Sequence, residues 1–118
     1  MNIYEIEAAL RRYEEAVAAI LGLWGREQQT LSRADAREAV RALKQSVKDE
    51  YKRQRRATGL EAQVYGPAMH RLHTELQRLS LNTRPGPEWI MVLRSAQDQI
   101  SYDIEHRVAS FKRTLPRN

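Results

Sequence analysis

Seven basic side chains follow one side of a helix predicted between residues 32 and 59. They recur every three or four residues, which is the spacing that keeps side chains on one face of an α-helix. These residues, here called the basic stripe, are Arg33, Arg37, Arg41, Lys44, Lys48, Lys52 and Arg55. The stripe would extend for about 33 Å along the helix axis. Guanidinium and ammonium groups bind phosphates and carboxylates, so the stripe predicts contact with an anionic partner.

The acidic residues of the same segment lie off the stripe. Asp35, Glu38 and Asp49 fall near the far side of the predicted helix. The sequence therefore predicts that the stripe is not neutralised within its own helix. Arg53 and Arg56 extend its basic character at the C-terminal end.

Two kinds of anionic partner fit the stripe. Nucleic-acid phosphates would be bound with little sequence information, and the chain shows no helix-turn-helix, zinc-finger, RRM or KH pattern for reading bases. The alternative is a protein-protein regulator or inhibitor, for example a phage or mobile-element protein, that docks on an acidic or nucleic-acid-handling protein. A plain solvated face and pairing within a homodimer are the other interpretations.

Three further residues are candidate partner contacts. Met91 and Tyr102 share the side of the predicted fourth helix that lies opposite its core seam. Exposed Met and Tyr favour protein interfaces, but a helix buried on two faces would also place them in the core. Arg84 lies between prolines in the segment SLNTRPGP, which is either a contact loop or a plain connector.

The residues needed for a metal site or an enzyme are few. His70 and His73 are three residues apart and would lie close enough on one helix to share an ion, but they lack a third ligand. Cysteine is absent. The chain contains no glycine-rich phosphate loop, no nucleophile elbow and no carboxylate pair on an apolar face. We therefore expect a non-enzymatic binding protein with no catalytic residue, no metal and no cofactor.

Helical periodicity of apolar residues runs through the whole chain. It predicts helices over about 3–24, 33–58, 67–80 and 87–112, with a loop at 80–87. Pro67 and Pro87 each stand where a helix would begin, a position that tolerates proline. The expected fold is all-α, an antiparallel bundle of about four amphipathic helices in a single domain covering residues 1–118.

The composition limits where such a protein would work. Twenty basic and fifteen acidic residues give a formal net charge of +5. The first fifteen residues carry charges throughout and lack the apolar stretch of a signal peptide. We expect no membrane insertion and a cytoplasmic location, as for a bacterial or phage protein.

Overall fold

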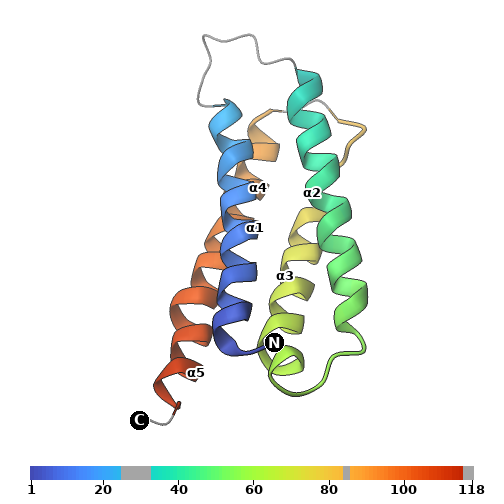
Figure 1. Cartoon of the computed structure of the whole chain (residues 1–118). Helices are drawn as coiled ribbons and strands as arrows, with labels where there is room; N and C mark the ends of the chain where they lie inside the picture. The colour runs from blue at the N-terminus through green and yellow to red at the C-terminus, as the bar shows by residue number, and fades with distance from the viewer. Residues whose placement is uncertain (25–32, 84–85, 116–118) are drawn as a thin grey trace.

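The chain folds into helices, as the sequence predicts. The computed structural model describes residues 1–24, 33–83 and 86–115, and it contains no strand within those ranges. The elements are α1 (Ile3–Trp24), α2 (Arg33–Gln54), the π-helical η1 (Glu61–Tyr65), α3 (Gly66–Leu76), α4 (Pro87–Tyr102), the π-helical η2 (Asp103–Val108) and α5 (Ala109–Arg113). The helices pack antiparallel in an elongated bundle 53 Å long, which confirms the predicted all-α class (Figure 1).

The helices pack in two tight pairs. α1 lies mainly against α4, and α2 lies mainly against α3, while α3 and α4 join the pairs. α1 and α2 stand next to each other in Figure 1 but make few mutual contacts. This arrangement leaves a line of weak packing between α1 and α2.

The core is built from the apolar seams of all four helical stretches. Leucine, isoleucine, valine and methionine at three- and four-residue spacing turn inward because this buries one continuous side of each helix. Its fully buried side chains include Ile6, Leu10, Val17, Val40, Val47, Met69, Leu72, Leu76, Trp89 and Leu93.

Two helix boundaries differ from the sequence-based prediction. α2 ends at Gln54 rather than near residue 58, and Gly59 then adopts a left-handed φ of 62° that reverses the chain. The next helix begins before Pro67, with η1. Proline within a helix lacks an N–H and crowds the preceding turn. Here that turn is a wider π turn, in which the Gly66 N–H donates to the Glu61 carbonyl.

The end of the third helix and the following loop also shift. α3 ends at Leu76 instead of near residue 80, because the chain tightens there into i→i+3 hydrogen bonds, such as the one from the Leu79 N–H to the Leu76 carbonyl. The connection to α4 therefore spans residues 77–86. From Pro87 the helix continues through η2 to Arg113, close to the predicted end.

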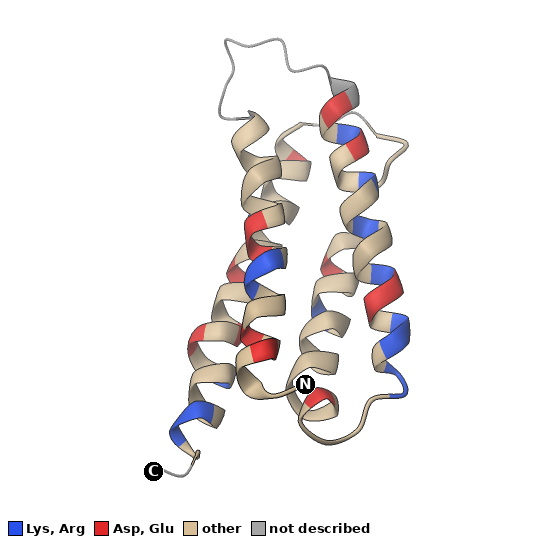
Figure 2. Ribbon diagram, in the orientation of Figure 1, with Lys and Arg blue, Asp and Glu red and all other residues tan. Residues whose placement is uncertain are grey.

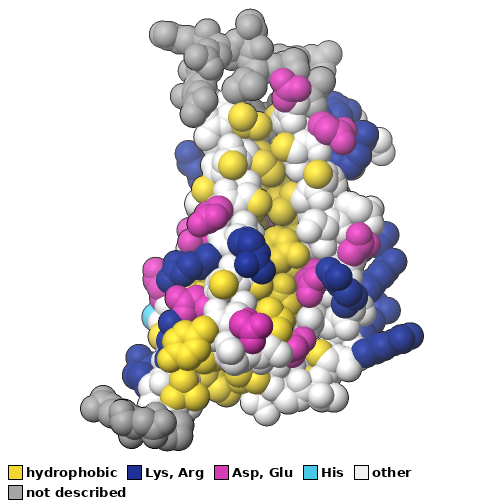
Figure 3. Space-filling model, in the orientation of Figure 1, with side chains coloured by type: hydrophobic (Ala, Val, Ile, Leu, Met, Phe, Trp, Pro, Cys, Tyr) yellow, Lys and Arg dark blue, Asp and Glu magenta, His cyan; other side chains and the backbone are white. Residues whose placement is uncertain are grey.

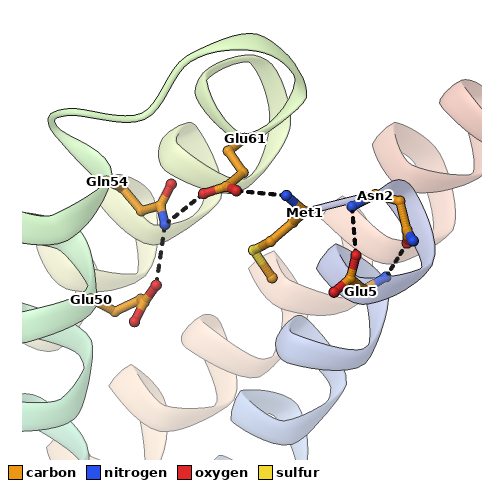
Figure 4. A network of polar contacts seen from close by, with 6 residues as sticks. All are labelled: Met1, Asn2, Glu5, Glu50, Gln54 and Glu61. Atoms are coloured by element: carbon orange, nitrogen blue, oxygen red, sulfur yellow. Dashed lines mark hydrogen bonds and ion pairs between the residues drawn. The ribbon is translucent and has the colours of Figure 1, made fainter.

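A polar network ties the start of α1 to the end of α2 (Figure 4). The Met1 amine donates to Glu61 at 2.8 Å, and the Gln54 amide donates to both Glu61 and Glu50. The hydrogen bond to Glu61 raises the pKa of the Met1 amine, and the same contact lowers the pKa of Glu61. Together these contacts hold the turn after α2 against the base of the bundle.

Buried carboxylates join α3 to α4 and η2. Asp103 is only 2% exposed and accepts from Arg71 at 2.6 Å and from Arg107 at 3.0 Å. Glu75, on α3, accepts from the Gln99 amide. These links fix the position of α3, and therefore of the histidines that it carries. No helix in the described ranges is both long and apolar enough to span a membrane.

Candidate anion-binding surface

From Arg37 to Lys52 the basic stripe lies along one side of α2, and Arg55 follows directly after the end of this helix. The buried face of α2 contains Val40 and Val47. It lies between the stripe and the side of α2 that faces the weakly packed line beside α1. Lys and Arg are spread along the whole length of α2 (Figure 2). The structure divides their side chains into three groups according to what they contact.

The first group caps the chain that follows α3. Arg37 donates to the carbonyls of Leu81, at 2.8 Å, and Thr83, at 3.3 Å, and Lys44 donates to the carbonyl of Leu79. Carbonyls in the irregular chain that follows a helix have no helical partner, so a charged side-chain donor that reaches them stabilises the connection. Partial burial also lowers the pKa of Lys44. Arg37 and Lys44 therefore have a structural role.

The second group is paired with acids on α2 itself. Arg41 contacts Glu38 at 3.3 Å, and Arg53 contacts Glu50. The expectation that the stripe is not neutralised within its helix is thus wrong for Arg41. Its long side chain reaches back one turn, so the acid need not point in the same direction as the stripe. Both arginines are exposed, and such pairs are weak.

The third group, here called the open cationic surface, comprises Lys48, Lys52, Arg55 and Arg56. All four are exposed. None of them forms an ion pair with any residue in the described part of the chain. Arg55 lies over the Tyr51 ring, with its guanidinium carbon 5.1 Å from the ring centroid. This surface occupies the last turns of α2 and the residues that follow.

Aromatic rings border the open cationic surface. Tyr51 stacks on His73, with centroids 4.8 Å apart and an interplanar angle of 11°, and its centroid lies 5.5 Å from that of His70. Partial burial lowers the pKa of His73, and neighbouring positive charges lower it further. Those charges belong, in decreasing order of effect, to Lys48, His70, Arg55 and Lys44. The imidazole of His73 thus stands in a positive field.

The remaining predicted contacts lie elsewhere. The side chain of Arg33, and Arg84 as a whole, fall outside the described residues. Met91 is 68% exposed and Tyr102 is 54% exposed, so neither belongs to a second buried face of α4. Tyr102 instead lies against the His106 ring, 4.4 Å between centroids. Both are on the helix that packs on α1 and α3, and so they are separate from the open cationic surface.

The histidines do not assemble a metal site in the part of the chain that is described. No group of three or more His, Cys, Asp or Glu side chains gathers there. His70 and His73 share the Tyr51 ring rather than a third ligand. The sequence analysis does not predict that Tyr51 meets the two histidines. The signal for this cluster in the sequence is the position of Tyr51, at the border between the apolar side of the helix and the basic stripe.

Comparison with protein families, curated proteins and solved structures finds no match to this chain.

Proposed function

We propose that this chain is a non-enzymatic protein that binds nucleic-acid phosphates through the open cationic surface. The observation that carries this proposal is the cluster of Lys48, Lys52, Arg55 and Arg56, which are exposed and have no acidic partner among the described residues. Uncompensated charge of one sign on one face attracts a ligand of the opposite sign. Arginine and lysine together suit phosphate, since arginine binds it with a planar fork and lysine as a point charge.

The aromatic border favours nucleic acid over an acidic protein. The rings of Tyr51, His70 and His73 stack together beside the cations, and His70 is the exposed one of the three. Proteins that bind single strands commonly combine a basic surface with rings on which bases stack. The four cations of this surface form no base-reading pattern, so we expect binding with little sequence preference.

The experiment is a salt titration of binding, measured by fluorescence anisotropy with labelled single-stranded and duplex oligonucleotides. Each phosphate neutralised on duplex contributes a slope of about −0.9 in log affinity against log salt, so four cations predict about −3 to −4. On a single strand the slope per phosphate is about −0.7. A flat salt dependence, or no binding at the lowest salt, would reject the proposal.

Binding is also expected to strengthen as the pH falls. The free protein holds the pKa of His73 below its ordinary value, because of burial and the surrounding cations. A bound phosphate offsets those charges and raises this pKa, so His73 takes up a proton on binding. Affinity should therefore rise as the pH falls from about 7.5 to about 5.5. We expect His73→Gln to reduce this dependence, whereas His106→Gln on η2 should leave it intact.

An acidic protein partner is the second candidate. The observation in its favour is the exposure of Met91 and Tyr102, two large side chains that bury much area at low entropic cost. Replacing both with alanine should leave oligonucleotide binding unchanged. A protein recovered from nuclease-treated lysate by the wild type, and lost with this variant, would favour a protein partner.

A further inference from the structure

An open groove of about 630 Å³ runs between α1 and α2. Hydrophobic side chains line this boundary in the space-filling view (Figure 3). The groove exists because α1 packs on α4 and α2 packs on α3, so the two helices leave apolar surface uncovered between them. On α2 it lies on the opposite side of the helix from the open cationic surface.

The two ends of the groove differ in polarity. One half is apolar and is lined by Ala16, Ala19, Ile20, Ala39, Ala42 and Leu43. The other half carries polar groups, from Arg12, Tyr13, Ser46, Glu50 and Tyr65, beside the apolar side chains of Met1 and Ala9. Burial, followed by the neighbouring Tyr13 and Glu50, raises the pKa of Tyr65 well above its usual value. Any occupant must match this change from apolar to polar.

We infer that two copies of this chain dimerise through this groove. The two bundles lie parallel, and α1 of each copy faces α2 of the other. Parallel packing sets the apolar half against its own equivalent, and it brings Arg12 opposite Glu50 of the partner subunit. Antiparallel packing would instead place apolar side chains against charged ones, which costs desolvation without compensation. The polarity of the groove thus selects both the occupant and its direction.

Charge complementarity supports a second copy as the occupant. Arg12 is exposed on α1 and forms no ion pair with a described residue. Glu50 stands across the groove on α2, where it already contacts Arg53 and the Gln54 amide, so Arg12 of the partner subunit would join this contact. A twofold axis that runs along the groove relates the two copies. The contact between Arg12 of one copy and Glu50 of the partner subunit therefore occurs twice, as an isologous interface requires. The bundle is 53 Å long, and a face two helices wide offers room for the roughly 800 Å² per partner of a standard interface.

This inference does not depend on the proposed function. In the parallel dimer both open cationic surfaces remain on the outside, because they lie on the other side of α2 from the groove. A failure to dimerise therefore leaves phosphate binding untouched, and a failure to bind oligonucleotides leaves the dimer untouched.

The test uses sedimentation velocity on the full chain and two charge-reversed variants. Arg12→Glu places two acids at each contact, and Glu50→Arg places two arginines there. The dissociation constant of the dimer should therefore rise at least about tenfold in each variant alone. Mixed together they should form a heterodimer, because both contacts then join Glu to Arg. Recovery on mixing is specific to the parallel register.

A third variant guards against misfolding of Glu50→Arg, since Glu50 also contacts Arg53 and Gln54. Ala42 is exposed, so Ala42→Glu should keep the helical circular dichroism of the wild type while introducing a charge into the apolar half. We expect it to be monomeric. A wild-type chain that stays monomeric from about 1 to about 200 µM would overturn the inference and leave the groove to another occupant. Dimerisation unaffected by Ala42→Glu would equally overturn it.

Discussion

Replacing Lys48 and Lys52 with glutamate is expected to weaken oligonucleotide binding by at least about a hundredfold at low salt. The change removes two phosphate contacts and adds two repulsive charges to the open cationic surface. Both side chains are exposed and contact no acid in the described ranges, so the fold should persist. The milder pair Lys48→Gln and Lys52→Gln should reduce the steepness of the salt dependence by about two.

The matched control applies the same change in net charge elsewhere. Arg94 lies on α4 and Arg113 on α5, and both are exposed. Reversing this pair to glutamate should weaken binding only slightly, through the long-range field. Equal losses in the two double variants would show that total charge, rather than the open cationic surface, governs binding.

Replacing Arg37 and Lys44 with methionine should lower the free energy of unfolding by about 2 kcal/mol. These side chains satisfy the carbonyls of Leu79, Leu81 and Thr83. Methionine keeps the aliphatic stem but donates no hydrogen bond, so the carbonyls lose their charged partners. Urea denaturation followed by circular dichroism measures the loss.

A second methionine pair provides the control for stability. Arg41→Met with Lys52→Met makes the same change in charge at exposed positions of α2 and should cost less than about 0.5 kcal/mol. If both pairs destabilised the chain equally, the capping role of Arg37 and Lys44 would be wrong.

The fold follows from the sequence where periodicity alone decides it. α1 begins and ends at the predicted residues because one unbroken apolar seam, through Ile6, Leu10 and Val17, defines it. The third helix was predicted less well. The sequence predicts Pro67 as the first residue of this helix, whereas the π turn before it lets the helix begin earlier. Such a turn depends on the packing of Val64 and Tyr65, which no local pattern encodes.

Only part of the candidate surface can be predicted from the sequence, because tertiary contacts decide the rest. Residue spacing places the cations of α2 on one face, but spacing contains no information about the neighbouring helix. The carbonyls that Arg37 and Lys44 cap come from residues more than thirty positions away. Likewise, Tyr51 meets His70 and His73 only because α3 packs alongside α2. Tertiary packing therefore gives some cations of this uniform pattern a structural role and leaves others exposed to a ligand.

The most direct test of the open cationic surface is a titration of the ¹⁵N-labelled protein with a short oligonucleotide, followed by amide chemical shifts. We expect the largest changes at Lys48, Lys52, Arg55 and Arg56, with smaller ones at His70 and His73. The amides of Met91 and Tyr102 should stay unchanged. Shifts concentrated on α4, or none at all at low salt, would contradict the assignment of this surface to nucleic-acid phosphates.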